Sequence, residues 1–270
     1  MITNIGIVGL GYVGGSVRHW FRKQKGRYRI FCYDKYKKIG SMEEVNRADI
    51  IFVAVPTPFR EGKKGYDDSA VWEVIGGIAD GKVIVVKSTI LPGSSDRFQK
   101  KYPKKTFLFN PEFLVAQSAK RDFTHPERQI VGYTNARSRS WAKKVLSILP
   151  PAPFSKIVRA KEAEIVKYFG NAFLATRVIF ANHIYDLCER LGNADYEVVK
   201  ECAAQDPRIG GSHFTVFHDG YRGFGGVCLP KDLKSLLQLA RSHRVLMPLL
   251  ETVHDVNKRL LKQKKRRMMS

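Results

Sequence analysis

One cysteine of this sequence lies in a setting that could support covalent chemistry. Cys228 follows two glycines and stands just before Pro230 and Asp232. The glycines leave its thiol sterically open, Pro230 suits the first turn of a helix, and Asp232 suits the third helical position. A thiol near a helix N-terminus is favoured as the thiolate, which can attack an aldehyde and carry the acyl group as a thioester. By itself, however, a lone cysteine is more often a small buried apolar residue.

The other three cysteines have no comparable neighbours. Cys32, Cys188 and Cys202 are far apart, and no two cysteines of the chain form a C-x-x-C pair. The spacing therefore predicts neither a disulfide framework nor a zinc site, and a reducing cytoplasm fits it best. We assign these three side chains to packing.

A glycine-rich turn near the N-terminus could bind phosphates. Residues 9–14 read G-L-G-Y-V-G between an apolar run and an amphipathic stretch. In a strand–turn–helix unit, Gly9 allows the tight turn, Gly11 lets a pyrophosphate approach the backbone, and Gly14 allows close helix–sheet packing. Asp34 follows the next apolar run and would bind the ribose of NAD while repelling the 2′-phosphate of NADP. The lysines that follow Asp34 would suit NADP, but the carboxylate decides for NAD.

Three polar motifs follow apolar runs farther along the chain. They are V-P-T-P at residues 55–58, K-S-T at 87–89 and N-P-E-F-L at 110–114. Each alone is ordinary loop chemistry, since proline, serine and threonine commonly end strands. Ligands of open α/β sheets bind beyond the carboxyl ends of the strands, so we expect these motifs to meet at one edge of a sheet.

Residues 1–159 are expected to form the Rossmann-like domain that positions these groups. Short apolar runs alternate with amphipathic stretches, which is typical of a doubly wound parallel sheet covered by helices on both faces. The expected strands are residues 5–8, 28–33, 50–55, 83–86, 107–109, 130–131 and 157–158, and the expected helices are 13–25, 71–79 and 137–149.

The pattern changes near residue 160. Residues 162–191 contain no proline and one glycine and carry apolar residues at helical spacing, so we expect one long helix that Gly192 ends. Further helices are expected at residues 196–204, 231–240 and 247–261. Residues 160–270 are therefore expected to form a second, mostly helical domain. Because so small a domain cannot cover so long an apolar helix, we expect a homodimer.

Composition and charge limit the classes of partner. Hydrophobic residues make up 44% and charged residues 27% of the chain, a balance typical of a folded soluble protein. No apolar run reaches the ~18 residues of a membrane span, and the glycine-rich start lacks the basic region of a signal peptide. The net charge of +22 would attract anions. Because the basic stretches lack interleaved aromatic residues, we interpret them as solvated faces rather than a nucleic-acid site.

A further motif, together with the order in which all the motifs occur along the chain, indicates a family. Residues 223–232 read G-F-G-G-V-C-L-P-K-D, which resembles the G-[FY]-G-G-x-C-x-P-K-D motif of the UDP-glucose/GDP-mannose dehydrogenases. That family's G-x-G-Y-V-G, V-P-T-P, K-S-T, N-P-E-F-L, K-Y-x-x-N-A-F-L-A and R-I-G motifs also occur here in order, the last two at residues 167–175 and 208–210. The resemblance runs from about residue 4 to about residue 255.

The resemblance implies oxidation of the C6 alcohol of a nucleotide sugar to a carboxylate with two NAD, with UDP-glucose expected as the substrate. Two hydride transfers would flank a thiohemiacetal on Cys228, and the thioester that results would be hydrolysed. Lys167 and Asn171, at i and i+4 on one helix face, would stabilise the developing oxyanion. From spacing alone, Lys167 would instead be a surface partner of Glu164.

The same resemblance implies roles for the remaining site residues. Asp232 and Thr89 would position or activate water, and Glu112 would be the acid or base of the thioester step. Arg208 would contact the sugar, in the family often across a dimer. The residues expected to bind NAD are Gly9, Gly11, Tyr12, Val13, Gly14, Asp34, Pro56, Thr57, Thr89 and Lys231. The residues expected to bind the nucleotide sugar are Glu112, Phe113, Leu114, Lys167, Asn171, Arg208 and Gly225.

The sequence departs from the family pattern at three places. Ala116 stands where the family has a second glutamate and cannot relay a proton, and the loop of residues 208–223, which includes Tyr221, is longer than usual. The chain also ends soon after its central helices, with a basic tail, residues 262–270, that we expect to extend the last helix. We therefore expect a truncated dehydrogenase that lacks the family's nucleotide-binding domain. The alternatives are that a separate chain supplies this domain, or that the chain is a non-catalytic NAD-binding or dimerisation module.

Overall fold

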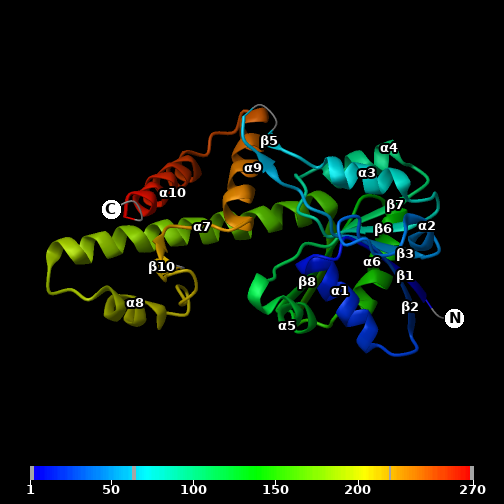
Figure 1. The fold of residues 1–270 in the computed structure, drawn as a ribbon, viewed down its shortest axis with the longest axis horizontal. Helices are drawn as coiled ribbons and strands as arrows, with labels where there is room; N and C mark the ends of the chain where they lie inside the picture. The colour runs from blue at the N-terminus through cyan, green and yellow to red at the C-terminus, as the bar shows by residue number, and fades with distance from the viewer. Residues whose placement is uncertain (1–2, 63–64, 219, 268–270) are drawn as a thin grey trace. The chain divides into compact units, whose positions relative to one another are not determined.

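The computed structural model describes residues 3–62, 65–218 and 220–267, and the chain divides into two compact units between Lys167 and Tyr168. The division falls within one long helix, α7 (Ala160–Leu191), which is drawn in green to yellow-green in Figure 1. Each unit has a buried apolar core of its own.

The first unit is built on a seven-stranded sheet (Figure 1). Its strands follow the order β2-β1-β3-β6-β7-β8-β9. Their bounds are β1 Thr3–Val8, β2 Tyr28–Tyr33, β3 Ile50–Val53, β6 Val83–Val86, β7 Thr106–Phe109, β8 Arg128–Tyr133 and β9 Phe154–Arg159. Each strand coincides with one of the expected apolar runs, so the expected α/β fold class is confirmed. A small separate hairpin is formed by β4 (Phe59–Arg60) and β5 (Gly65–Tyr66).

One strand pairing departs from the expected parallel sheet. β8 runs antiparallel to β7, with Tyr133 opposite Leu108, whereas the other neighbouring strands of this sheet are parallel. For β8 to run parallel to β7, the connection would have to cross the sheet to the end at which β7 begins. Residues 110–127 make no such crossover, and they hold only a short 3-10 turn (Ala116–Ser118) and the short helix α5 (Ala119–Thr124). β8 therefore begins beside the carboxyl end of β7 and runs in the opposite direction.

Three longer helices of this unit lie where the sequence predicts them, namely α1 (Tyr12–Lys23), α3 (Ser69–Gly77) and α6 (Ala136–Ile148). The sequence did not predict α2 (Met42–Val45), α4 (Ser94–Lys101) or α5. Phe98 is the one buried apolar residue of α4, so this segment has no apolar period by which a helix could be recognised.

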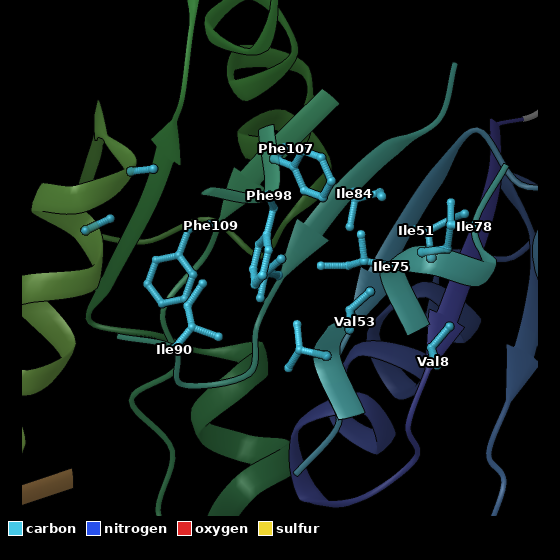
Figure 2. Close-up of a cluster of buried hydrophobic side chains, with 14 of the residues drawn as sticks. Val8, Ile51, Val53, Ile75, Ile78, Ile84, Ile90, Phe98, Phe107 and Phe109 are labelled. Atoms are coloured by element: carbon cyan, nitrogen blue, oxygen red, sulfur yellow. The ribbon is translucent and has the colours of Figure 1, made fainter. Parts of the chain in front are cut away.

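Alternate residues of the central strands fill two separate cores. Ile51 and Val53 belong to the core that contains buried residues of α2, α3 and α4 (Figure 2). Ile50 and Phe52 belong to the core that contains buried residues of α1, α5 and α6. Because both faces of the sheet are covered, its inner strands are continuous apolar runs rather than alternating ones.

The second unit consists of α7 from Tyr168 onward, α8 (Tyr196–Ala204), α9 (Cys228–Ser242) and α10 (Pro248–Arg267). Ala175 of α7, Leu233 of α9 and Val256 of α10 share one core. A two-stranded hairpin, β10 (Phe217–His218) with β11 (Tyr221–Arg222), lies within the long loop between α8 and α9.

The helix ends confirm two expectations and correct a third. Gly192, with φ of +67°, follows the last residue of α7, and α10 continues to Arg267, so the basic tail extends the last helix, while residues 268–270 lie outside the described residues. α9 begins at Cys228 rather than near Lys231, so Asp232 is not the third residue of the helix but lies in its second turn. Within the described ranges, every helix is too short or too polar to serve as a membrane span.

The exposure of the cysteines corrects one assignment. Cys188 is buried and Cys32 is half-buried, but Cys202 is exposed, so its assignment to packing was wrong. Cys202 lies on the solvent side of the short helix α8, a position that the local sequence does not reveal.

Candidate active site

The glycine turn after β1 has the geometry that a dinucleotide needs. Gly9 adopts a φ of +85°, and a Cβ on Gly14 would lie 1.8 Å from the carbonyl oxygen of Gly9. A Cβ on Gly11 would meet no protein atom within 4 Å, so the backbone there is open to a ligand. Tyr12 and Val13 follow as the first residues of α1, and a helix N-terminus favours an anion.

Asp34 joins the end of β2 to this turn. Its Oδ2 accepts a hydrogen bond from the backbone N–H of Leu10 at 2.7 Å, and its Oδ1 accepts from the N–H groups of Tyr36 and Lys37 at 3.0 and 2.9 Å. Burial acts to raise the pKa of this carboxyl, but the three backbone donors and the Lys37 charge outweigh it and hold the pKa below its usual value. A carboxylate oxygen can accept two hydrogen bonds, so Oδ2 keeps one for a ribose hydroxyl.

A pocket of about 280 Å³ lies at the carboxyl ends of β1, β2 and β3, and Gly9, Gly11, Asp34 and Pro56 are among its lining residues. An open glycine, an acid with spare acceptor capacity and a neighbouring helix N-terminus fit the adenosine and pyrophosphate of NAD. Thr57 is not among the lining residues and instead ties two loops together.

The loops after β3 and β6 are held to each other at Thr89. The Thr57 hydroxyl donates to the Thr89 carbonyl at 2.8 Å, and the Tyr66 hydroxyl donates to the same oxygen at 3.2 Å. Ser88 donates to the Val55 carbonyl at 2.7 Å. The V-P-T-P and K-S-T motifs therefore do meet at one edge of the sheet, as expected.

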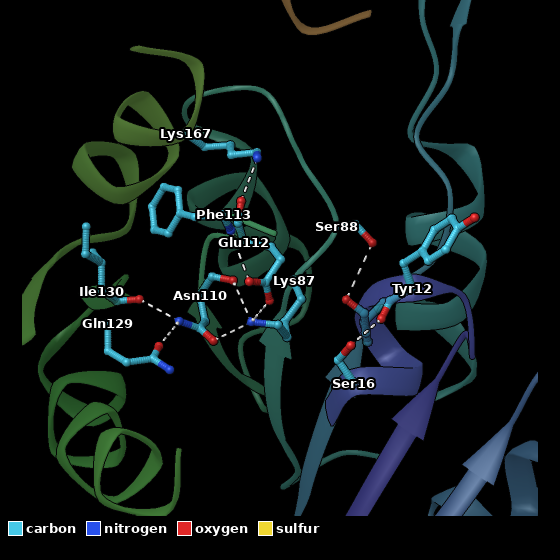
Figure 3. Close-up of polar contacts among 11 residues, drawn as sticks. Tyr12, Ser16, Lys87, Ser88, Asn110, Glu112, Phe113, Gln129, Ile130 and Lys167 are labelled. Atoms are coloured by element: carbon cyan, nitrogen blue, oxygen red, sulfur yellow. Dashed lines mark hydrogen bonds and ion pairs between the residues drawn. The ribbon is translucent and has the colours of Figure 1, made fainter. Parts of the chain in front are cut away.

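Glu112 and Lys167 meet within the first unit. The Lys167 amine donates to the backbone carbonyl of Glu112 at 2.5 Å, and Figure 3 shows the side chain of Lys167 directed at this segment. The Glu112 carboxylate pairs with the buried amine of Lys87, with 2.9 Å between Oε2 and Nζ. The centroid of the Phe113 ring lies 3.9 Å from the guanidinium carbon of Arg128 and 5.8 Å from the Lys167 amine.

Glu164 is not a surface partner of Lys167, which corrects the simpler interpretation of the spacing. Its side chain is fully buried, and its oxygens accept hydrogen bonds from the backbone N–H groups of Gly93 and Ser95 at 2.5 and 2.9 Å, at the start of α4. Burial raises the pKa of this carboxyl to about 7, against the effect of these donors. Glu164 thus holds the start of α4, close in the chain to Thr89.

Within the second unit, Asn171 and Lys231 both contact Asp232. The Asn171 amide donates to Oδ2 of Asp232 at 2.5 Å, and the Lys231 amine pairs with Oδ1. Asp232 is 1% exposed, so the Lys231 charge balances a buried carboxylate that the Asn171 amide helps to orient. Cys228 is exposed at the first residue of the same helix, as expected for a thiol near a helix N-terminus.

The glycine loop before Cys228 depends on two residues that local spacing did not reveal. The Asn257 side chain accepts from the Phe224 N–H at 2.7 Å and donates to the Phe224 carbonyl at 2.9 Å. A Cβ on Gly225 would lie 2.2 Å from the Tyr221 hydroxyl, so the inserted loop packs directly over this glycine. Neither neighbour can be recognised locally, since their contacts form only in the folded chain.

Arg208 is an exposed residue on a turn that hydrogen bonds hold in place. Its guanidinium forms an ion pair with Asp206 at 2.6 Å while the side chain stays 88% exposed. Arg177 donates to the carbonyl oxygens of Ile209 and Gly210, both at 2.7 Å, and so fixes the turn that carries Arg208. This role of Arg177 could not be recognised from the sequence, because a basic residue in a helix is usually solvated.

Comparison with known proteins identifies the family of this chain. The NAD-binding domain model of the UDP-glucose/GDP-mannose dehydrogenase family matches residues 34–149, and the central domain model of the same family matches residues 161–259. The chain belongs to the UDP-glucose/GDP-mannose dehydrogenase family. NAD is the cofactor of the first of these domains, so the expected cofactor is confirmed.

Two relatives show how far the similarity to other dehydrogenases of this family extends. The UDP-glucose 6-dehydrogenase of Rickettsia prowazekii is 34% identical over 232 residues, which are 83% of this chain and 52% of that protein. UDP-glucose 6-dehydrogenase TuaD of Bacillus subtilis is 37% identical over 227 residues, 80% of this chain and 47% of that protein. The chain thus spans about half the length of the curated relatives it matches.

Solved structures of the family share the fold. A UDP-glucose dehydrogenase from Pyrobaculum islandicum aligns with a TM-score of 0.83 at 28% identity, over 96% of this chain and 68% of that one. A UDP-D-ManNAc dehydrogenase from Pyrococcus horikoshii aligns with a TM-score of 0.81 over 96% of this chain and 69% of that one, and at 19% identity it supports the fold alone.

Proposed function

We propose that this chain carries out NAD-dependent oxidation of the C6 alcohol of a nucleotide sugar, with UDP-glucose as substrate and UDP-glucuronate as product. The observation that supports it best is an exposed Cys228 at the first residue of α9, in a family of dehydrogenases whose motifs this chain carries in order. Relatives named UDP-glucose 6-dehydrogenase support the choice of sugar and base.

The residues at the ends of β1, β2 and β3 fit NAD. Gly11 leaves the backbone open for the pyrophosphate, and Asp34 has acceptor capacity left for a ribose hydroxyl. The remaining proposed contacts come from Gly9, Tyr12, Val13, Gly14, Pro56, Thr57, Thr89 and Lys231. NAD, when bound, supplies the acceptor for the hydrides removed from C6.

Cys228 would carry the carbon skeleton between the two oxidation steps. Its thiolate would add to the C6 aldehyde and form a carbon–sulfur bond, and the carbonyl oxygen would become the oxyanion of a thiohemiacetal. The second oxidation would leave a thioester, and water would then add to its carbonyl, break the carbon–sulfur bond and return the thiolate. The products would be a carboxylate and the free enzyme.

Other polar residues would stabilise the oxyanion, position water and exchange protons. Lys167 and Asn171 would stabilise the oxyanion, as an ammonium and an amide can. Asp232 and Thr89 would position water, and Glu112 would exchange protons in the thioester step. For the substrate, we propose contacts from Phe113, Leu114, Arg208 and Gly225 in addition to Glu112, Lys167 and Asn171.

We propose that the enzyme is a homodimer of the cytoplasm whose subunits meet along α7. Large apolar side chains of this helix are exposed on the single chain, including Phe169, Phe173 and Phe180 at 71%, 53% and 59%. Exposed apolar surface of this extent on one element is typical of an interface. The first domain would comprise residues 1–159 and the dimerisation domain residues 160–270.

NADH formation against a panel of nucleotide sugars and free sugar phosphates tests this function. We expect two NADH per UDP-glucose, and no NADH from Cys228→Ala in continuous turnover. Tight binding of NAD without NADH from any sugar of the panel would contradict the proposal. It would favour an NAD-binding or dimerisation module instead.

A further inference from the structure

Lys87 is a buried cation whose neighbours are polar atoms of the candidate site. It follows β6, and its side chain is 2% exposed. The Nζ atom lies 2.9 Å from Oε2 of Glu112 and 2.6 Å from the side-chain oxygen of Asn110, and it donates a longer bond of 3.4 Å to the Asn110 carbonyl. Two of these contacts are hydrogen bonds to Asn110, and the contact with Glu112 is an ion pair (Figure 3).

Asn110 is held in turn by the next strand. Its side-chain amide donates to the Ile130 carbonyl at 2.8 Å and to the Gln129 side chain at 3.3 Å. Asn110 and Gln129 are both buried. Lys87 is therefore anchored through Asn110 to β8, and its amine has little freedom to move away from Glu112.

The Glu112 carboxylate depends on Lys87 at one of its two oxygens. Oε1 accepts a hydrogen bond from the Phe113 N–H at 3.0 Å. Oε2 is buried and accepts no hydrogen bond from the described residues, so the charge of this oxygen is balanced by the ion pair with Lys87. Both side chains line one cavity of about 610 Å³ in the first unit, which gives the carboxylate access to water.

We propose that Lys87 is a positioning residue that holds the Glu112 carboxylate in place, as a charged pair, for the hydrolysis of the acyl-enzyme. This role rests on the proposed function. In the step concerned, the water oxygen bonds to the thioester carbon, one water proton passes to Glu112, and the carbon–sulfur bond breaks to return the Cys228 thiolate. Glu112 then releases the proton to solvent through the cavity.

The first measurement separates oxidation from hydrolysis in Lys87→Met, which keeps the length of the side chain without its charge. We expect kcat to fall roughly tenfold or more, up to the ~10²- to 10⁴-fold that a general base contributes, with KM for the sugar little changed. Acylated Cys228 should accumulate in intact-mass spectra. Lys105→Met is the matched control, because Lys105 is also buried in this unit but bonds the Ile75 carbonyl, and it should keep the wild-type kcat.

A double-mutant cycle tests whether Lys87 acts through Glu112. Glu112→Gln should also accumulate acyl-enzyme, and Lys87→Met should slow this variant no further. The double variant also removes the unpaired buried charge that Lys87→Met leaves, so it should recover part of the melting temperature lost in that single variant. A wild-type kcat in Lys87→Met, or an additional loss of rate in the Glu112→Gln background, would overturn the proposal.

The failure of the proposed function would be visible separately. If the wild-type chain forms no NADH, the proposed dehydrogenase activity fails, and the link between Lys87 and Glu112 is judged from the melting temperatures alone. Recovery in the double variant would then support the pair, whereas additive losses would overturn it as well.

Discussion

The side chain of Asn257 is hydrogen-bonded to both backbone polar groups of Phe224, thirty-three positions earlier in the chain. One amide thus takes the place of a strand neighbour for a loop residue, because it accepts from the N–H and donates to the carbonyl. The loop held in this way leads directly to Cys228, and Gly223 within it, at a φ of +83°, lies against the same side chain.

Asn257→Ala should therefore destabilise the second unit. Because the substitution leaves two buried backbone groups of Phe224 without partners, we expect the free energy of unfolding to fall by roughly 2 to 4 kcal/mol. Urea unfolding would measure the loss. Lys258→Ala, at the exposed neighbouring position of α10, should stay within ~0.5 kcal/mol of the wild type, and equal stabilities of both variants would contradict the account.

Cys228→Ser should stop turnover at a slow or trapped acyl stage. A serine hydroxyl is a weaker nucleophile than a thiolate, and an ester hydrolyses more slowly than a thioester. Intact-mass analysis after incubation with UDP-glucose and NAD would locate the adduct on residue 228. Cys202→Ser is the control, since Cys202 is also exposed but begins no helix. Full activity of Cys228→Ser would refute covalent catalysis, and so would a wild-type activity that thiol alkylation leaves unchanged.

The chain should bind NAD in preference to NADP. Asp34→Ala should reduce the ratio of the NADP and NAD dissociation constants by about tenfold or more, and tenfold corresponds to about 1.4 kcal/mol. The carboxylate repels a 2′-phosphate and has one acceptor position left for a ribose hydroxyl. Calorimetric titration of both cofactors measures the ratio. Because Asp34 also holds Leu10, Tyr36 and Lys37, Asp34→Asn is the milder companion variant. Tighter binding of NADP by the wild type would show that the lysines decide instead.

The protein should be a dimer at micromolar concentration, and Phe180→Glu should dissociate it. Phe180 is 59% exposed on α7, and a buried charge without a partner would oppose association. Sedimentation velocity gives the masses. Arg190→Ala, an exposed position on the same helix with the same change in net charge, should remain dimeric. A monomeric wild type would remove the basis for the proposed interface.

Stability should depend on pH through Glu164. Burial raises its pKa from 4.5 to about 7, so between these values the folded state keeps a proton that the unfolded state has released. The free energy of unfolding should consequently fall as the pH rises from 4.5 to 7, by roughly 3 kcal/mol from this group, and then level off. Urea unfolding across this range measures the slope.

Glu164→Gln should remove this contribution to the slope because the amide does not titrate. Glu162→Gln changes an exposed glutamate of the same helix and should keep it. A slope in Glu164→Gln equal to that of the wild type would show that the buried carboxyl does not titrate in this window.

The strands and most long helices could be predicted because their cause is local. A strand buried on both faces has to be a continuous apolar run, as in β3 and β6, and a long amphipathic helix repeats its apolar residues at a fixed period. α4 was missed because it has no such period, since Phe98 is its one buried apolar residue. Its start is held by Glu164 from a distant part of the chain. The strand β8 was predicted but its antiparallel direction was not, because strand direction depends on whether a connection crosses the sheet.

The sequence by itself determined the residue types of the proposed chemistry: the glycine turn with Asp34, the strand-end motifs, and the cysteine loop. Their spacing is constrained by the backbone geometry that each turn needs, so it can be read locally. The partners of these groups were decided by the tertiary structure alone. Lys87 meets Glu112, Asn171 meets Asp232, and Asn257 meets Phe224 only after folding has placed distant segments side by side. A buried polar group must find a partner, but nothing in local spacing says which distant residue supplies it.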